Sequence, residues 1–147
     1  MSKTKISDLW QTPRELFETL NKEFKFNYDV CANESNKLAP CLGDYFTEEY
    51  SNCTCFMNPP FSNSLIFVRR AITLSYNNVL TVCLLKADTS TKVFHELYDY
   101  SIQKAKPGIE IRFFPKRIQY THPLKLVSGC AFPSMLAIIY PFRVKHE

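Results

Sequence analysis

Residues 53–64 read CTCFMNPPFSNS and contain the most specific pattern in the chain. The apolar run at residues 53–57 predicts a short buried strand. Ser62-Asn63-Ser64 predicts the start of a helix, so Asn58-Pro59-Pro60-Phe61 would form the turn between strand and helix. Two prolines alone indicate only a turn, which could carry a buried Phe and no function. A strand, an Asn-Pro-Pro-aromatic turn and a helix in succession are much rarer by chance, so we take this turn as the candidate functional site.

The residue types of this turn suit a planar amino group. The exocyclic amino group of a nucleobase is a poor nucleophile because its lone pair is delocalised into the ring. Asn58 offers a side-chain carbonyl and Pro59 a backbone carbonyl, while the fixed φ of proline keeps the turn rigid. Two such acceptors would take the N–H bonds and leave the lone pair free to attack a methyl donor. Phe61 offers a flat apolar face for stacking a base, and catalysis would rest on positioning and preorganised dipoles. The predicted catalytic residues are Asn58, Pro59, Pro60 and Phe61.

The composition limits the classes of protein to consider. The 147 residues suffice for one compact domain, residues 1–147, without a separate target-recognition domain. With only three glycines, the chain has neither a Walker loop nor a G-x-G-x-x-G turn. A formal net charge of +4 permits nucleic-acid binding without requiring it. The sequence has no apolar run of membrane-spanning length and no apolar signal core at its N-terminus, so we expect a cytoplasmic, intracellular protein with no membrane partner.

The six cysteines do not show the paired spacing of zinc ligands. In an intracellular protein they should be mostly reduced. Cys53 and Cys55 alternate on one face of an expected strand, and Cys83 lies inside another. We therefore expect buried small hydrophobic residues and no metal site.

Helical and strand patterns alternate along the chain, which favours an α/β fold. A capping box at Thr12-Pro13-Arg14-Glu15, with Thr12 as the cap, predicts a helix that ends near residue 24. The continuous apolar run at residues 79–85 predicts a strand covered on both faces. Further strands are expected at residues 26–30, 44–47, 53–57, 109–114 and 135–140, and further helices from residue 64 to about 76 and after the capping residues 88–91. The basic segment 116–120 is expected to project from the sheet as a hairpin arm.

Several short motifs, taken together and in this order, resemble the phage DNA adenine methyltransferases of the Dam-like family. They are Trp10-Gln11-Thr12-Pro13 with Leu16-Phe17, Phe26-Asn27-Tyr28-Asp29-Val30-Cys31-Ala32, Tyr45-Phe46-Thr47, Asn58-Pro59-Pro60-Phe61-Ser62, Leu84-Leu85-Lys86-Ala87-Asp88-Thr89-Ser90-Thr91 with Phe94-His95, Ile111-Arg112-Phe113 and Phe132-Pro133-Ser134. The resemblance implies a trimmed, Rossmann-like methyltransferase fold with a mostly parallel sheet flanked by helices. It also implies a phage-encoded enzyme that transfers a methyl group from S-adenosyl-L-methionine to the N6 amino group of adenine in double-stranded DNA, with no obligate protein partner evident.

The resemblance also suggests where the cofactor binds. It implies that Thr12-Pro13 lies near the methionine end of the cofactor and that Asp29 and Ala32 form the first-strand site. An acidic residue at the carboxyl end of a first strand is also well placed, on physical grounds, to bind a ligand in the crevice of an open α/β sheet, although a turn-capping Asp is an equal alternative. Asp44, Glu48 and Glu49 are alternative partners for the ribose hydroxyls. The full set of cofactor candidates is Trp10, Thr12, Pro13, Asp29, Ala32, Asp44, Glu48 and Asn58.

DNA contacts are expected from basic residues within the same domain. The segment with Lys116, Arg117, Tyr120 and His122 is the preferred group, because it combines positive, aromatic and polar side chains. Each cation taken singly could equally be a solvated surface charge. The candidates are Lys86, Lys92, Arg112, Lys116, Arg117, Tyr120 and Lys125.

Other functions remain open at this stage. The same turn would suit the amino group of cytosine or the side-chain amide of a glutamine in a protein. The chain also lacks the usual Gly-rich turn after the first strand, where Asp29-Val30-Cys31-Ala32-Asn33 stands instead. A non-catalytic nucleic-acid-binding protein on a decayed methyltransferase scaffold is therefore a third alternative.

Overall fold

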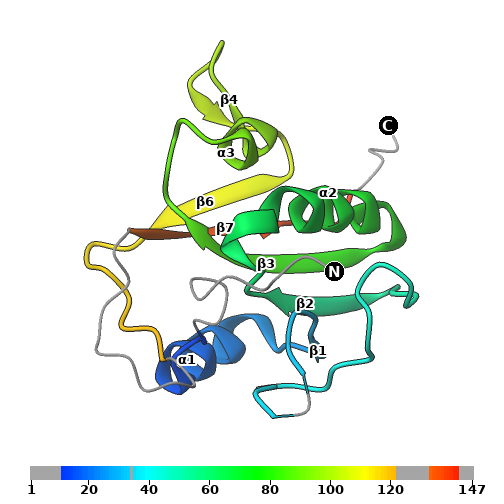
Figure 1. The fold of residues 1–147 in the computed structure, drawn as a ribbon. Coiled ribbons are helices and arrows are strands. Elements are labelled where there is room, and N and C mark those ends of the chain that lie inside the picture. Colours follow the sequence, from blue (N-terminus) through cyan, green and yellow to red (C-terminus); the bar gives the residue numbers. More distant parts are fainter. Residues whose placement is uncertain (1–10, 34, 122–132, 143–147) are drawn as a thin grey trace.

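The computed structural model describes residues 11–33, 35–121 and 133–142 of the chain (Figure 1). Four residues named above lie outside this described part, namely Trp10, His122, Lys125 and Phe132, and so does Cys130, one of the six cysteines. The described residues form a five-stranded sheet with helices on both of its faces, which confirms the α/β class.

The sheet has the strand order β1-β2-β3-β7-β6. Its strands are β1 (Tyr28–Asp29), β2 (Cys53–Met57), β3 (Val79–Lys86), β6 (Ile109–Phe113) and β7 (Ser134–Ile139). β1, β2 and β3 pair in parallel, whereas β7 pairs antiparallel with both β3 and β6. The sheet is therefore mixed, and the expected mostly parallel sheet was correct only for its first three strands. The direction of the strands on the far side of β3 depends on the long-range pairing of β7. A local sequence pattern does not predict this pairing.

Helices α2 (Ser64–Leu74) and α3 (Lys92–Leu97) cover one face of the sheet, and α1 (Arg14–Phe24) covers the other (Figure 1). Alternate residues of β3 point to the two sides. Cys83 and Leu85 join the core under α2, while Val82 and Leu84 join the core under α1. All four are at most 1% exposed. The continuous apolar run of β3 is thus confirmed as a strand buried on both faces.

The cysteines of the described strands behave as small apolar residues. Cys55 and Cys83 are fully buried in the core under α2, and Cys53 packs against the same core. Burial in apolar surroundings raises the pKa of the Cys53 thiol above its usual value. These thiols are therefore core residues, as expected.

Helix α1 begins in a different way from the one expected. Pro13, rather than Thr12, occupies the cap position, and no side chain caps the helix. The helix ends where Lys25 takes a left-handed conformation, φ 57°, and its backbone N–H donates to the carbonyl of Asn21. The predicted end near residue 24 is confirmed, but the predicted capping by Thr12 was wrong. The hydroxyl of Thr12 instead accepts a hydrogen bond from the side-chain amide of Asn58.

Two other segments differ from expectation. Residues 44–47 form a turn rather than a strand, because the Asp44 carboxylate accepts from the Phe46 N–H at 2.8 Å and the Asp44 carbonyl accepts from the Thr47 N–H at 3.2 Å. Between β3 and β6 the chain adds a separate two-stranded sheet, β4 (Tyr98–Asp99) paired with β5 (Lys104–Ala105), which lies beyond α3 (Figure 1). The sequence pattern did not predict this small sheet.

The short helical elements follow local rules more closely. The Thr91 side chain accepts from the backbone N–H of Phe94 and caps α3, as the residues at 88–91 predicted. A 3-10 turn, η2 (Phe61–Asn63), leads into α2, and another, η3 (Ser75–Asn77), extends it close to the predicted end near residue 76. In the described part of the chain, none of the helices combines the length and the apolar character needed to cross a membrane.

Candidate active site

The carboxyl ends of β1, β2 and β3 meet at one edge of the sheet, because these strands are parallel and paired in register. Asp29 lies at the end of β1, Asn58 directly follows β2, and Lys86 ends β3. Ser134, the first residue of the antiparallel β7, pairs with Lys86 and so reaches the same edge. In an open α/β sheet this edge is where ligands bind, and the Asn-Pro-Pro-Phe turn lies on it.

The turn itself is compact and half-buried. Pro59 is buried, whereas Asn58, Pro60 and Phe61 are partly exposed. The carbonyl of Pro60 accepts from the Asn63 N–H at 3.1 Å and closes the 3-10 turn η2. The strand, turn and helix predicted from residues 53–64 are therefore confirmed, with the turn directly at the carboxyl edge.

Thr12 contacts the turn across the fold. The Nδ2 of Asn58 donates to the Oγ1 of Thr12 at 2.9 Å, a contact between residues 46 positions apart. The amide group of Asn58 is thereby oriented with its nitrogen toward α1. Its carbonyl oxygen, on the other arm of the planar amide, is the acceptor that the chemistry of an amino substrate requires.

The segment after β6 packs beside the turn instead of projecting from the sheet. Ile118 is 8% exposed and Tyr120 is 4% exposed. The Oη of Tyr120 lies 2.7 Å from the Oγ of Ser134, and the ring of Phe61 meets the ring of Tyr120 edge-on, with centroids 6.1 Å apart. The expected projecting arm was therefore wrong. Its alternation of apolar Ile118 and Tyr120 with polar neighbours was the signal for a half-buried segment.

The same segment is tied to the start of α1. Gln11 and Thr121 exchange two backbone hydrogen bonds, of 2.7 and 3.1 Å. Gln11 directly precedes Thr12, and Thr121 directly follows Tyr120. Two segments that are distant in sequence thus lie against the turn, one through Asn58 and the other through Phe61.

Asp29 is buried beneath the loop that follows β1. Its side chain is 5% exposed, and its Oδ2 accepts from the Leu38 N–H at 3.1 Å. Its own backbone N–H donates to the carbonyl of Pro40 at 2.9 Å. Burial raises the pKa of this carboxyl to about 6, although the bond from Leu38 opposes the shift. A carboxylate held in this way is a favourable partner for a cationic ligand group.

This burial predicts a pH-dependent stability. Between the ordinary Asp pKa of about 3.9 and the folded value of about 6, the folded protein retains a proton that the unfolded chain releases. Protonated Asp29 therefore makes its full contribution to the free energy of unfolding below about pH 4. This contribution, up to about 3 kcal/mol, is lost as the pH rises through 6. Asp29→Asn should flatten this part of the curve, because Asn cannot ionise and still accepts from Leu38. Urea unfolding at several pH values from 4 to 7 measures the free energy of unfolding of both proteins. The same decrease with pH in wild type and variant would contradict the prediction.

Three other cofactor candidates lie along the segment between β1 and β2. Ala32 lies in the loop after β1, where its carbonyl accepts from the Cys41 thiol at 3.1 Å. Asp44 is exposed and its carboxylate is engaged in the turn at 44–47. Glu48 is half-buried, and its carboxylate lies beside Gly43, where an added Cβ would come within 3.4 Å of it.

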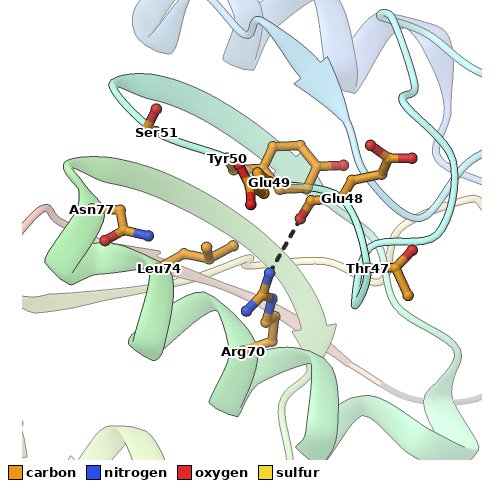
Figure 2. Close-up of a pocket in the computed structure, with 8 residues that line it drawn as sticks. All are labelled: Thr47, Glu48, Glu49, Tyr50, Ser51, Arg70, Leu74 and Asn77. Carbon is orange, nitrogen blue, oxygen red and sulfur yellow. Dashed lines mark hydrogen bonds between the residues drawn. The ribbon is translucent and has the colours of Figure 1, made fainter.

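Glu48 also lines a hollow of about 540 Å³ (Figure 2). Ser51 and Asn77, which line it, come just before β2 and β3 begin, so the hollow lies toward the amino ends of these strands, opposite to the Asn58–Phe61 turn. Arg70 of α2 donates to the carbonyl of Glu48 across it at 3.2 Å. The full lining is Thr47, Glu48, Glu49, Tyr50, Ser51, Arg70, Leu74 and Asn77.

Most of the cations expected to contact DNA lie near the carboxyl edge. Lys86 ends β3, Lys92 begins α3, and Lys116 and Arg117 follow β6; all four are exposed. The Nζ of Lys86 lies 3.9 Å from the Asp88 carboxylate, which forms a loose ion pair. Lys86 ends β3 at the edge that carries the turn, and Lys116 and Arg117 follow β6, which ends at the same edge.

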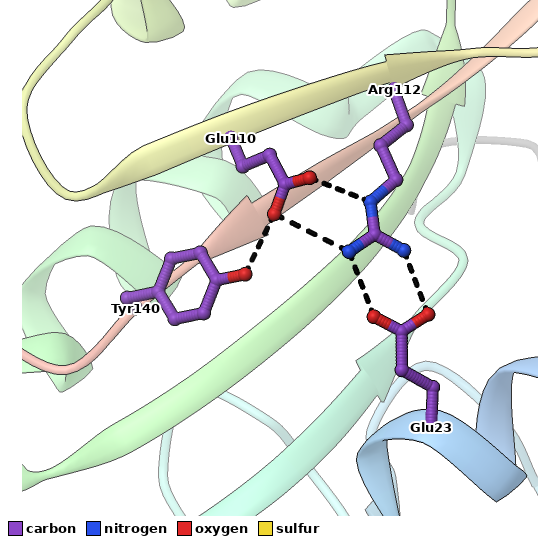
Figure 3. A network of polar contacts seen from close by, with 4 residues as sticks. All are labelled: Glu23, Glu110, Arg112 and Tyr140. Carbon is purple, nitrogen blue, oxygen red and sulfur yellow. Dashed lines mark hydrogen bonds and ion pairs between the residues drawn. The ribbon is translucent and has the colours of Figure 1, made fainter.

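Arg112 is engaged in a network of its own (Figure 3). Its guanidinium makes two bonds of 2.7 Å to the Glu23 carboxylate and one of 2.7 Å to Glu110. Tyr140 donates to the same Glu110 at 2.7 Å. These bonds lower the pKa of both carboxyls and raise that of Arg112. Since Glu23 belongs to α1 and Arg112 to β6, the network joins the carboxyl end of α1 to the sheet.

The chain matches a known protein family along nearly its whole length. Residues 1–146 match the family described as "DNA N-6-adenine-methyltransferase (Dam)". A DNA N-6-adenine-methyltransferase of Haemophilus phage HP1 is 40% identical over 122 residues, which is 75% of this chain and 66% of that protein. A DNA N-6-adenine-methyltransferase of Escherichia phage T1 is 35% identical over 102 residues, 62% of this chain and 41% of that protein.

The matched part is thus less than two thirds of the length of either relative. No solved structure matches the chain. The family match nevertheless includes every described element of the sheet and the Asn58–Phe61 turn. The chain belongs to the DNA N-6-adenine-methyltransferase (Dam) family.

Proposed function

We propose that this protein transfers a methyl group from S-adenosyl-L-methionine to the exocyclic N6 of adenine in double-stranded DNA. The observation that carries the proposal is the orientation of Asn58 at the carboxyl end of β2. Its amide nitrogen donates to Thr12, which directs its carbonyl oxygen to the other side. Family membership and the two phage relatives, both described as DNA N-6-adenine-methyltransferases, support the same activity.

The turn supplies two acceptors for the two N–H bonds of the adenine amino group. We assign the first to the Oδ1 of Asn58 and the second to the carbonyl of Pro59, because the Pro60 carbonyl is already bonded to the Asn63 N–H. Bonding both hydrogens in this plane disfavours conjugation of the nitrogen lone pair with the ring and directs it to the methyl donor. The contribution of the protein is positioning and electrostatic preorganisation.

Phe61 provides the face for stacking. An adenine inside a duplex has its amino group paired, so the base must leave the helix to reach the turn. The partly exposed Phe61 ring adjoins Asn58 and rests edge-on against Tyr120. We therefore assign Tyr120, which is buried, to supporting Phe61 rather than to direct contact with DNA.

The residues around Asp29 fit the methionine end of the cofactor. S-adenosyl-L-methionine supplies an electrophilic methyl group on a sulfonium and carries an ammonium group that needs an anionic partner. Burial raises the pKa of the Asp29 carboxyl, and an ammonium group beside it would compensate the charge of the ionised form. Pro13, Ala32, Asp44 and Glu48 remain candidates for the rest of the cofactor, as does Trp10 outside the described residues.

The sheet fits a trimmed Rossmann-like methyltransferase. The first three strands are parallel, with ligand-facing residues at their carboxyl ends, as in doubly wound folds. Between β1 and β2 the described residues, 30–33 and 35–52, contain neither a helix nor a strand. This is where a larger sheet of this kind would add units, and their absence from that interval is the basis for calling the fold trimmed.

Asp29→Asn should weaken cofactor binding. The variant keeps the shape and the acceptor for Leu38 but loses the charge that would pair with the ammonium group. We expect about a tenfold or larger increase in the dissociation constant for S-adenosyl-L-methionine, measured by calorimetry at pH 7.5, with a smaller change in turnover. Unchanged affinity would transfer this role to another acidic residue, such as Asp44 or Glu48.

Neutralising Lys116 and Arg117 should weaken DNA binding at every sequence. Both side chains are exposed and follow β6 at the carboxyl edge. Each lost phosphate contact reduces the slope of log affinity against log salt concentration by about 0.9 on duplex DNA. DNA affinity at several salt concentrations is compared for wild type and the Lys116→Ala, Arg117→Ala protein, with cofactor affinity as the control. Identical slopes would show that DNA is held elsewhere, with Lys86 and Lys92 as the next candidates.

The proposed activity is tested by incubating the protein with radiolabelled S-adenosyl-L-methionine and unmodified duplex DNA, followed by nucleoside analysis. Label in N6-methyldeoxyadenosine supports the proposal. Label in N4-methyldeoxycytidine would instead identify cytosine as the substrate. Transfer only to the side-chain amide of a protein glutamine would show that the substrate is a protein and not DNA. Cofactor binding or DNA binding without any transfer would indicate a non-catalytic protein. Asn58→Ala serves as the matched inactive control in each case.

A further inference from the structure

We infer that Thr12 is a positioning residue for Asn58: its hydroxyl fixes which end of the Asn58 amide faces the substrate. This inference rests on the proposed function. It differs from the role that the family resemblance implied for Thr12, which was contact with the methionine end of the cofactor. The two roles predict different kinetic effects, so they can be separated.

The hydroxyl of Thr12 is available for this role because it does not cap the helix. A Thr before a Pro at a helix start usually caps with its side chain. Here Pro13 occupies the cap position with φ −60° and ψ 136°, and no side chain caps α1. The Thr12 Oγ1 instead accepts from the Asn58 Nδ2 at 2.9 Å.

Thr12 is held in place on both sides. On its amino side, Gln11 exchanges two backbone hydrogen bonds with Thr121. On its carboxyl side, Pro13 has a fixed φ, and its carbonyl accepts from the Phe17 N–H at 3.1 Å in the first turn of α1. At the far end of the helix, Glu23 is bonded twice to Arg112 of β6. The position of the Thr12 hydroxyl relative to the turn is therefore set by several independent contacts.

The orientation of the amide decides whether the turn can accept an amino group. The two arms of an Asn amide have similar size and opposite hydrogen-bonding character. With the nitrogen on Thr12, the carbonyl faces the substrate and accepts from the adenine N6–H. After a half-turn about the Cβ–Cγ axis, an NH2 group would face an NH2 group. No hydrogen bond forms between two donors, so only one orientation is productive.

The test compares Thr12→Val with Thr12→Ser. Valine keeps the shape of threonine and removes the hydroxyl; serine keeps the hydroxyl and removes a methyl group. We expect Thr12→Val to lower the turnover number about tenfold to a hundredfold at saturating DNA and cofactor, with dissociation constants for both ligands nearly unchanged. Thr12→Ser should restore most of the turnover. An increase in the cofactor dissociation constant of Thr12→Val without loss of turnover would overturn the inference in favour of direct cofactor contact.

A second comparison distinguishes positioning from simple loss of stability. In an Asn58→Ala protein, Thr12→Val should cause no further loss of turnover, because the amide that Thr12 orients is gone. Independent losses that multiply would overturn the inference.

A third measurement does not depend on activity. The side-chain amide of Asn58, followed by ¹⁵N NMR, should show a hydrogen-bonded NH2 in wild type and Thr12→Ser and lose that signature in Thr12→Val. An unchanged amide signal in Thr12→Val would refute the positioning role even if the protein methylates DNA. A wild type that shows the signature but transfers no methyl group would refute the proposed function and leave the Thr12–Asn58 contact established.

Discussion

Asn58→Ala is expected to lower the rate of methyl transfer at least about a hundredfold. The variant removes one of the two acceptors that we propose for the substrate amino group, and losing one preorganised hydrogen-bonding group costs about 3 kcal/mol in such sites. Because Asn58 is only partly buried, the melting temperature and the affinity for S-adenosyl-L-methionine should change little. Single-turnover kinetics with duplex DNA measure the effect, and wild-type rates in this variant would refute the proposed mechanism.

Asn63→Ala is the matched control for this experiment. Asn63 follows the turn closely, ends η2 and occupies the cap position of α2, but its side chain makes no capping bond. It is exposed, so the substitution should change stability by no more than about 0.5 kcal/mol. Turnover should remain close to that of wild type. A similar loss of turnover in both variants would mean that it results from a disturbed turn and not from removal of the Asn58 amide.

Phe61→Ala is expected to produce the second largest loss. Stacking a flipped base on an aromatic ring contributes about 1–3 kcal/mol, so methyl transfer at subsaturating DNA should fall about tenfold to a hundredfold. Phe61→Trp should keep a substantial part of the activity, because it preserves a flat face next to Asn58. The measurement is kcat/KM for DNA in the two variants. Equal values for Ala and Trp would assign Phe61 to core packing alone.

Phe142→Ala provides the control for the aromatic ring. Phe142 is 54% exposed and its ring packs at a tilt against that of Tyr76, with ring centroids 4.7 Å apart. Its backbone N–H donates to the carbonyl of Ser75, so it lies beyond the carboxyl end of α2, away from the Asn58–Phe61 turn. Removing this ring should leave kcat/KM unchanged. A loss equal to that of Phe61→Ala would point to a general effect on stability.

Local patterns were sufficient for the central part of the fold. The apolar run at residues 53–57, the Asn-Pro-Pro-Phe turn and the helix after it all occur as predicted, because strand, turn and helix are specified by neighbouring residues. The same holds for β3, whose unbroken apolar run requires cover on both faces, and for the Thr91 cap of α3. These features depend on interactions within a few residues of each other.

Predictions failed where a residue had a choice between a local and a distant partner. Thr12 fits a capping box, but its hydroxyl bonds to Asn58 instead. The segment 116–120 has the basic and polar character of a projecting arm, but Ile118 is buried and Tyr120 packs against Phe61. In each case the local pattern describes what the side chain can do and not which partner lies within reach.

The amino-acid sequence by itself determined the α/β class, the position of the Asn58–Phe61 turn and the chemistry of its residues, since these follow from periodicity and residue type. Only the tertiary structure decided that β7 runs antiparallel beside β3, that Tyr120 is buried against Phe61, and that Thr12 meets Asn58. The physical reason is that hydrogen bonds and packing contacts across the fold form only after distant segments have come together. Their partners are therefore set by the geometry of the whole sheet and are not encoded in the spacing of nearby residues.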